Sequence, residues 1–367
     1  MKRAAKLVGL ALLIALAILA AAEGAARAIF EQPIRPWINH PFWQVSRDHE
    51  YHGPRFDADF PDRKFDYYVS PLGMRGHSLT KVEREPGTFR AIFLGGSTTE
   101  NMGTPEEYTF PGLVEKGLAE AFKGQLKVEV GNAGLTGARS SHTLAQLAIR
   151  IPPLKPDLVF VLDGGNDLLD SMRPGYDPTT EDLSYVPRPE FGDWLLWKSR
   201  LYAVMASRWG DFRERSAREI FAKQARRRAM DEYTRPEKDA AWNVPAFEAS
   251  LARMTALASC IPTRIVFMTQ PSLYKESLPK EEAAVLWIGH QGGVNLDPRF
   301  LLEGTRAYND AIRKVARERG ALLVDLDAAV PKDLEHFFDD VHLTRKGNAA
   351  VARAILAALE EAKIPSR

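Results

Sequence analysis

The sequence has little cysteine and almost no net charge, and each shortage excludes a class of protein. Its 367 residues include one cysteine, Cys260, which cannot form an internal disulfide or supply a cysteine metal cluster. Because Cys260 lies in a segment rich in Ala and Leu, we expect it to be a small buried side chain. The formal net charge is +1, so the composition gives no argument for nucleic acid, and we predict no nucleic-acid partner.

Several common ligand-binding signatures are missing as well. The glycines before Ser97 lack the Lys of a phosphate-binding loop and the third Gly of a dinucleotide fingerprint. Ser97 is not flanked by glycines as in the G-x-S-x-G elbow of other hydrolases. His142, His336 and His342 form no obvious metal set with the acidic residues, so we predict no metal and no cofactor.

One stretch at the N-terminus, residues 7–22, is apolar and uncharged. Three basic residues precede it: Lys2, Arg3 and Lys6. This order is typical of an export signal. Small residues at 20–22 offer a cleavage site for a signal peptide, whereas the weaker apolar continuation to Phe30 allows an uncleaved helix. We therefore predict a signal anchor over residues 1–30, with a cleaved signal peptide and secretion as the alternative. Either way, the body of the protein is expected in the cell envelope, facing the periplasm or the cell exterior.

The rest of the chain divides into an extension and one large domain. Residues 31–87 show no sustained period and are predicted to be a linker followed by an extension that packs on the domain. From residue 88 to 364, apolar strands alternate with helices, which indicates a parallel sheet with crossover helices. Strands are expected at 90–94, 127–130, 157–162, 263–270 and 321–325, and helices after Thr109, at 305–319 and after Thr344. Two insertions interrupt the pattern, at about 171–244 and 272–303. The first is expected to be polar and Pro-rich at its start and then helical. Its basic run at 223–228 is expected on a solvated face, with contact to an anionic substrate or to the outer leaflet as the alternative.

Candidate functional residues follow the ends of successive predicted strands. Ser97 follows the first strand, and two other residues, Asp339 and His342, precede the final helix. Ligands bind at the carboxyl edge of such sheets. A serine nucleophile needs a base, and His342 has an ordinary pKa near working pH. Asp339, three residues earlier, is placed to orient His342, and this spacing favours it over Asp340, the second candidate carboxylate. The sequence therefore predicts a Ser-His-Asp catalytic site.

Two further residues at strand ends are candidate donors to a negatively charged oxygen. Gly137 lies in the turn after the second strand and Asn166 follows the third. An oxyanion needs converging donors, and the backbone N–H groups of Ser97 and Gly137 with the side-chain amide of Asn166 supply three. We predict these three groups as the oxyanion hole.

Four short motifs, in this order, resemble those of the SGNH (GDSL-type) hydrolases. The family's Gly-Asp-Ser, Asn-x-x-x-x-Gly, Gly-x-Asn-Asp and Asp-x-x-His blocks match residues 95–97, 132–137, 164–167 and 339–342. The resemblance covers roughly residues 90–362 and implies a flavodoxin-like three-layer sandwich with a five-stranded parallel sheet. It also assigns the oxyanion glycine to Gly137 rather than Gly134.

Gly96 departs from the family pattern, which has aspartate at this position. The departure separates the chain from the lipase-like members. The resulting Gly-Gly-Ser-Thr-Thr run resembles that of envelope proteins linked to polysaccharide modification, so the resemblance favours an acylated glycan as substrate. We therefore predict an exported serine esterase acting on an O-acyl, first an O-acetyl, ester of a glycan or other envelope molecule. An O-acyltransferase using the same site is the second hypothesis, and a catalytically silent, membrane-tethered glycan-binding or assembly subunit is the third.

Overall fold

The computed structural model describes residues 2–29, 39–40, 43–44, 49–54, 64–101, 103–172, 176–177, 199–202, 204–205, 233–291 and 294–364. Most of the first predicted insertion, including its basic run at 223–228, lies outside the described residues, as does much of the predicted linker.

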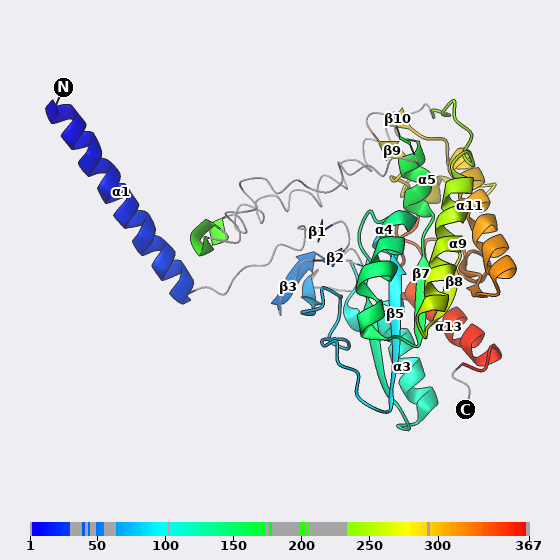
Figure 1. The fold of residues 1–367 in the computed structure, drawn as a ribbon. Helices are drawn as coiled ribbons and strands as arrows, with labels where there is room; N and C mark the ends of the chain where they lie inside the picture. The colour runs from blue at the N-terminus through cyan, green and yellow to red at the C-terminus, as the bar shows by residue number, and fades with distance from the viewer. Residues whose placement is uncertain are drawn as a thin grey trace.

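A five-stranded parallel sheet forms the centre of the domain (Figure 1), with the order β11-β8-β7-β5-β6. Its strands are β5 (Thr88–Gly95), β6 (Lys127–Asn132), β7 (Leu158–Leu162), β8 (Arg264–Met268) and β11 (Leu322–Val324). Numbered along the chain, the order is 2-1-3-4-5, which is that of flavodoxin-like folds. The predicted fold class and all five predicted strands are therefore confirmed.

The strands are apolar because both faces of the sheet are covered. Every residue of β5 and β7 is buried. Phe93 of β5 stacks on Phe160 of β7, with ring centroids 4.3 Å apart, and its ring edge contacts Phe110 at 5.5 Å. These aromatic contacts tie the two central strands to a covering helix.

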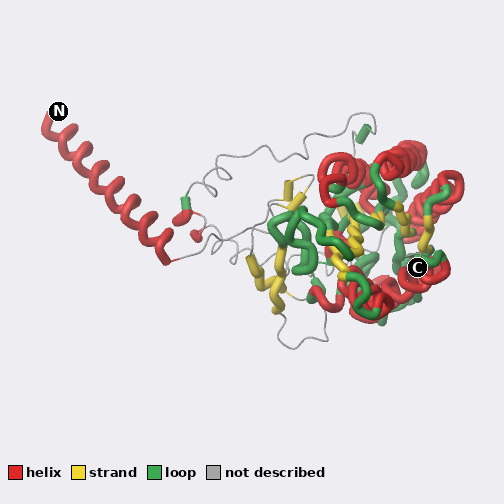
Figure 2. The backbone as a smooth tube through the Cα atoms, turned by 60° about the horizontal axis from the view of Figure 1, so that its bottom comes forward, coloured by secondary structure: helices red, strands yellow, loops and turns green. Residues whose placement is uncertain are grey.

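Helices cover both faces, so the domain has three layers (Figures 1 and 2). On one face, α3 (Phe110–Phe122) packs against α13 (Arg345–Glu361); on the other, α9 (Val244–Cys260) packs against α4 (Ser140–Ala145) and α11 (Pro298–Arg319). Shorter helical segments connect these elements: α2 (Ser97–Glu100), η1 (Glu106–Tyr108), η2 (Gln146–Arg150), η3 (Pro152–Leu154), α5 (Gly165–Ser171), α10 (Lys280–Ala283) and α12 (Leu326–Ala329).

The predicted start of α3 is confirmed, whereas α11 begins earlier than predicted. Thr109 precedes α3 and its hydroxyl accepts the N–H of Gly112 at 3.2 Å, as an N-cap does. α11 begins at Pro298 rather than Thr305, and the carboxylate of Asp297 caps it. The extra turns bury Phe300, so they belong to the core and not to a surface insertion.

The expectation that Cys260 is buried is wrong. Cys260 ends α9 and is exposed. The buried face of this helix is formed by Phe247, Leu251, Met254 and Ala258. Ala258 is the last residue on this face, and the chain leaves the helix two residues later, so the thiol points away from the core.

α1 (Lys2–Ile29) stands apart from the domain in both views (Figures 1 and 2). Its segment Lys6–Ile29 is long and apolar enough to cross a membrane, a test that a signal sequence also passes. The carboxylate of Glu23, near the end of this helix, accepts hydrogen bonds from the Ser199 hydroxyl and from the backbone N–H groups of Arg200 and Leu201, at 2.7, 2.8 and 2.9 Å. α1 therefore contacts a described part of the first insertion.

Three antiparallel pairs of short strands lie outside the parallel ladder. They are β1 (Asn39–His40) with β2 (Trp43–Gln44), β3 (His49–Pro54) with β4 (Lys64–Val69), and β9 (His290–Gln291) with β10 (Val294–Asn295). After β4 the chain turns, and the backbone N–H of Arg75 donates to the carbonyl of Asn132 at 2.8 Å. The extension therefore packs against the end of β6, close to the carboxyl edge.

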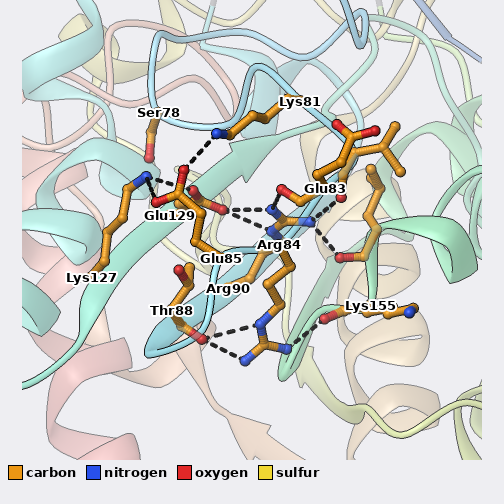
Figure 3. A network of polar contacts seen from close by, with 12 residues as sticks. Ser78, Lys81, Glu83, Arg84, Glu85, Thr88, Arg90, Lys127, Glu129 and Lys155 are labelled. Carbon is orange, nitrogen blue, oxygen red and sulfur yellow. Dashed lines mark hydrogen bonds and ion pairs between the residues drawn. The ribbon is translucent and has the colours of Figure 1, made fainter.

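A network of charges lies at the opposite edge, where β5 and β6 begin (Figure 3). The Arg90 side chain is fully buried, and its Nε and Nη2 donate to Glu129 Oε2 at 2.9 and 2.7 Å. Its remaining N–H groups donate to the backbone carbonyls of Val82, Glu83 and Leu154. All five donors of the guanidinium are thus used, as a buried charge requires.

Candidate active site

The turn after β5 delivers Ser97 to the carboxyl edge of the sheet. Gly95 has a φ of +150°, and a Cβ atom there would lie 2.3 Å from the carbonyl oxygen of Leu162. Glycine is therefore required where β5 turns beside the end of β7. α2 begins at Ser97, immediately after this turn.

Ser97, His342 and Asp339 are joined by hydrogen bonds. His342 Nε2 lies 2.8 Å from Ser97 Oγ, and His342 Nδ1 lies 2.7 Å from Asp339 Oδ2. The second oxygen, Asp339 Oδ1, accepts the backbone N–H groups of Val341 and His342 at 3.0 and 2.8 Å. The carboxylate is thereby fixed on its own loop while it holds the imidazole. The three residues predicted as a triad lie in one hydrogen-bonded series.

The charges around His342 favour its protonated form. Burial is the largest single effect and lowers the pKa of His342, but the charge and hydrogen bond of Asp339 together with the charges of Asp340 and Glu100 outweigh burial, so this pKa is raised. Burial is likewise the largest single effect on Asp339 and raises its pKa, but the charge and hydrogen bonds of His342 together with the Trp287 indole outweigh burial, so the pKa of Asp339 is lowered. The pair therefore exists as carboxylate and imidazolium up to a higher pH than free histidine would allow. The ring of Phe338 is stacked on His342, 13° from parallel.

The segments that carry Gly137 and Asn166 meet beside the turn that carries Ser97. Asn166 is on α5, and its Nδ2 donates to the carbonyl of Ala138 at 2.8 Å. A Cβ atom on Gly96 would lie 2.7 Å from Asn166 Nδ2 and 3.4 Å from the Ala138 carbonyl oxygen. Gly96 precedes Ser97 and Gly137 precedes Ala138, so the three predicted oxyanion segments are adjacent. The amide of Asn166 has a second N–H for a further acceptor.

This packing gives a physical reason for the glycine at position 96. Its φ of −86° suits any residue, so the backbone does not require glycine. The space that a side chain would need is instead occupied by the amide of Asn166. An aspartate here, as the related motif has, would require Asn166 to move.

Two buried carboxyl groups hold the loops after β6 and β7 together. Asp167 accepts the backbone N–H and the hydroxyl of Ser140, the latter at 2.5 Å, and Asp163 accepts the Thr143 hydroxyl at 3.1 Å. Burial raises the pKa of both groups, and the charge of Asp167 raises that of Asp163 further. These contacts fix the segment after Gly137 relative to the segment of Asn166.

Glu100 and Arg75 connect the turn that carries Ser97 to its surroundings, and the sequence argument gave neither of them a role. The buried carboxylate of Glu100 accepts the N–H and the hydroxyl of Thr136, both at 2.6 Å. The guanidinium of Arg75 donates to the backbone carbonyls of Glu100, Asn101 and Thr104. A charged residue three positions after the nucleophile, on a turn that must be buried, is the signal that was available for Glu100. Arg75 had none, since its partners are backbone atoms.

The structure distinguishes the two candidate carboxylates. Asp339 contacts His342, whereas Asp340 Oδ1 accepts the hydroxyl of Tyr274 and Asp340 Oδ2 accepts the backbone N–H of Trp287. Trp287 also donates its indole N–H to Asp339 Oδ2 at 2.8 Å. Sequence reasoning gave this tryptophan no role, because an insertion has no periodic pattern that would show which way it faces.

Among the residues that the structure describes, no group of three or more His, Cys, Asp or Glu side chains is arranged to hold a metal ion.

A 2-1-3-4-5 parallel sheet with serine, histidine and aspartate in contact at its carboxyl edge has the architecture of the SGNH hydrolases. Residues 93–350, well over half of the chain, match the model of the GDSL-like lipase/acylhydrolase family. The chain belongs to this family, and it is an ester-hydrolysing enzyme.

Solved structures with a similar fold include three esterases or hydrolases. The acetylxylan esterase Axe2 from Geobacillus stearothermophilus is 17% identical, covering 74% of this chain and 95% of its own, with a TM-score of 0.44. LAE5, an α/β hydrolase from the metagenome of Lake Arreo, Spain, is 15% identical with the same coverages and a TM-score of 0.43. A putative GDSL-like lipase from Parabacteroides merdae is 12% identical, covering 76% and 99%, with a TM-score of 0.44. No curated protein matches the sequence significantly.

Proposed function

We propose that the protein is an exported serine esterase, held at the membrane by α1, that cleaves an O-acyl ester of a glycan or another envelope molecule. An O-acetyl ester is the first choice. The observation that carries the proposal is the unbroken series of hydrogen bonds from Ser97 Oγ through the His342 ring to the buried carboxylate of Asp339. A hydroxyl, a base and a base-orienting carboxylate in this order are what nucleophilic acyl transfer requires.

In the first half of the proposed reaction, Ser97 Oγ attacks the ester carbonyl carbon while His342 Nε2 takes the hydroxyl proton. The carbonyl oxygen becomes negatively charged and is held by the N–H groups of Ser97 and Gly137 and by the Asn166 amide. Asp339 keeps Nδ1 of His342 protonated and stabilises the imidazolium. When the carbonyl forms again, the ester bond to the alcohol breaks, and His342 donates its proton to the leaving alkoxide. The product is an acyl group on Ser97 and a free hydroxyl on the substrate.

In the second half, water attacks the acyl carbon and gives a proton to His342. The bond to Ser97 Oγ then breaks, Ser97 regains the proton from His342, and the carboxylic acid leaves. If a sugar hydroxyl takes the place of water, the same steps transfer the acyl group instead. Hydrolysis and transfer therefore differ only in the acceptor.

Two features support the envelope location and the glycan substrate. α1 carries an apolar segment of membrane-spanning length, preceded by Lys2 and Arg3, which favours an uncleaved anchor with its N-terminus in the cytoplasm. Glu23 at the other end of this segment binds the backbone of residues 200 and 201, a contact that supports retention of the helix. The glycine at position 96 supports a substrate different from that of the lipase-like relatives.

The test is hydrolysis of p-nitrophenyl acetate and of acetylated xylo-oligosaccharides by the full-length protein in detergent. Changing Ser97→Ala should lower kcat/KM by about 10⁴-fold or more, since the nucleophile is lost. A matched control is Ser259→Ala, because Ser259 is an exposed serine of α9 whose hydroxyl donates to a helix carbonyl; it should keep wild-type activity. Mass spectrometry of the quenched enzyme should find the acetyl group on Ser97.

Equal rates of ester hydrolysis by the wild type and by Ser97→Ala would refute the proposal that the protein is a serine esterase that uses Ser97. A parallel incubation with an unacetylated oligosaccharide distinguishes water from a sugar hydroxyl as the acceptor of the acyl group. If acetyl groups appear on the oligosaccharide in place of free acetate, the protein is an acyltransferase. N-terminal sequencing of the protein recovered from membranes checks the anchor, which is refuted if the chain begins after residue 22.

A further inference from the structure

The loop before α13 carries two adjacent carboxylates that face different parts of the molecule. Asp339 is hydrogen-bonded to His342. Asp340 is fully buried, and its carboxylate accepts hydrogen bonds from the Tyr274 hydroxyl at 2.8 Å and from the backbone N–H groups of Trp287 and Ile288 at 2.6 and 3.0 Å. Three donors from the second insertion therefore converge on this one carboxylate.

The backbone of Asp340 holds the same insertion. Its carbonyl accepts the N–H of Leu273 at 2.8 Å. Both the start of the insertion, at Leu273 and Tyr274, and its middle, at Trp287, are thus tied to one residue. Hydrogen bonds to a buried carboxylate are shorter and stronger than neutral ones, so Asp340 fixes where the backbone of Trp287 lies.

From this position the Trp287 side chain reaches the catalytic residues. Its indole Nε1 donates to Asp339 Oδ2 at 2.8 Å, and Asp339 Oδ2 is the oxygen that accepts His342 Nδ1 at 2.7 Å. An indole N–H can only donate, so the contact is compatible only with an acceptor oxygen, as in the ionised form of Asp339. The other oxygen of this carboxylate is held by its own loop.

We propose that Trp287 is a positioning residue of the esterase, which fixes Asp339 Oδ2 in line with His342 Nδ1, and that Asp340 is the residue that positions Trp287. The second insertion is thereby part of the catalytic apparatus. This inference rests on the proposed roles of Ser97, His342 and Asp339.

Two charge effects make the inference testable by pH. The charged groups that face His342 are Asp339, Asp340 and Glu100, and each raises the pKa of His342. The indole N–H withdraws negative charge from Asp339 Oδ2, so its loss strengthens the attraction to the imidazolium and raises the pKa of His342 further. Loss of the Asp340 charge lowers that pKa. The two changes act in opposite directions on the same group.

The experiment compares kcat, KM and the pH dependence of kcat/KM for p-nitrophenyl acetate in full-length variants. Trp287→Phe keeps an aromatic but smaller side chain and removes the N–H, and should lower kcat by roughly 10- to 100-fold, the effect of one hydrogen bond to a charged group. KM should change by less than about twofold, because the indole stabilises the catalytic arrangement and not bound ester. The acid limb of kcat/KM should move to higher pH.

Asp340→Asn retains an oxygen for the two backbone N–H groups, and should move the acid limb to lower pH.

Trp242→Phe is the matched control, since the Trp242 indole donates to a backbone carbonyl, that of Ser171, at 3.2 Å. It should leave kcat and the pH profile unchanged. Wild-type kcat and an unmoved acid limb in Trp287→Phe refute the positioning role. If Trp287→Phe lowers the thermal stability but leaves both limbs of the pH profile of kcat/KM unmoved, Trp287 has a structural role only, and the positioning role is refuted as well. If Trp287→Phe does not fold, wild-type kcat in Asp340→Ala, which removes the carboxylate that holds the backbone N–H groups of Trp287 and Ile288, refutes the inference.

Ser97→Ala separates this inference from the proposed function. If Ser97→Ala is as active as wild type, the esterase mechanism is wrong, whatever Trp287 does. If Ser97→Ala is inactive and Trp287→Phe behaves as wild type, only the positioning role is wrong.

Discussion

Two aspartate–histidine pairs lie close together before α13, and both have the Asp-x-x-His spacing. In each pair a carboxylate oxygen lies 2.7 Å from the histidine Nδ1: Asp333 with His336, and Asp339 with His342. In each, the carboxylate also accepts the backbone N–H of its own histidine, at 3.0 Å for His336 and 2.8 Å for His342. The local geometry of the two motifs is therefore almost the same.

Their surroundings differ. The side chain of Asp333 is 43% exposed and that of Asp339 is 3% exposed. Asp333 uses one oxygen, Oδ1, for the backbone and for the imidazole. Asp339 uses Oδ1 for the backbone and Oδ2 for the imidazole and the Trp287 indole. On the far side of the ring, His342 Nε2 meets Ser97 Oγ.

The comparison shows that the motif alone does not make a catalytic pair. A spacing of three positions between an aspartate and a histidine produces the carboxylate–imidazole contact twice, because the contact needs only a local turn. The pairs differ in three ways: the Asp339 carboxylate is buried, its Oδ2 also accepts the Trp287 indole N–H, and the Ser97 hydroxyl lies at the opposite nitrogen of His342. All three come from distant parts of the chain.

The largest expected effect is the loss of kcat when the buried pair of Asp339 and His342 is changed. Asp339→Asn should lower kcat by about 10⁴-fold, because an amide no longer holds His342 in the tautomer that accepts the Ser97 proton. The matched change Asp333→Asn should leave kcat within about twofold, since surface substitutions away from a site have small effects. Steady-state hydrolysis of p-nitrophenyl acetate measures both. Equal losses in the two variants would mean that the pairs are equivalent.

The next effect is on stability, at the opposite edge of the sheet (Figure 3). Arg90→Met leaves the buried carboxylate of Glu129 without its guanidinium partner, which should lower the free energy of unfolding by about 3–5 kcal/mol. Arg84→Met removes a partly exposed pair with Asp157 and should cost about 0–1 kcal/mol. Urea unfolding measures the difference, and kcat per folded molecule should not change in either variant. A large fall in kcat would show that the two edges are coupled.

The third prediction concerns the groups that face Ser97. Asn166→Ala removes one proposed oxyanion donor and should lower kcat by about 10²- to 10³-fold. Asn166 is only partly buried, so the urea midpoint should stay close to that of wild type. A rise in KM with kcat unchanged would instead mean that Asn166 contributes to binding of the ground-state substrate.

The smallest effect is electrostatic. The charge of Glu100 raises the pKa of His342, and the ester is attacked only when His342 is unprotonated. Glu100→Gln keeps an oxygen for Thr136 but removes the charge, so the pKa of His342 falls and the acid limb of kcat/KM should move to lower pH. Glu107→Gln, an exposed glutamate of η1, is the control. A limb that stays in place, or moves to higher pH, contradicts the prediction.

Much of the fold follows from the sequence, because strand and helix patterns are properties of neighbouring residues. The apolar runs at β5 and β7 and the Thr109 cap of α3 were recognisable in this way. The early start of α11 and the exposure of Cys260 were not, since the first depends on packing of Phe300 and the second on the rotation of α9. Arg75 and Trp287 were missed because their acceptors lie far away in the sequence.

By itself, the sequence determined where the polar residues lie along the chain. Ser97 follows the first strand of the sheet, Asn166 follows the third, and an aspartate precedes each of two histidines by three positions. These are consequences of local backbone geometry and of the rule that parallel strands end at one edge. The sequence also predicted His342 as the base for Ser97, but only the tertiary structure shows that His342 Nε2 lies 2.8 Å from Ser97 Oγ and that the Trp287 indole contacts Asp339. Ser97 and His342 are 245 residues apart, and a contact over that separation exists only when the whole sheet and its covering helices have packed.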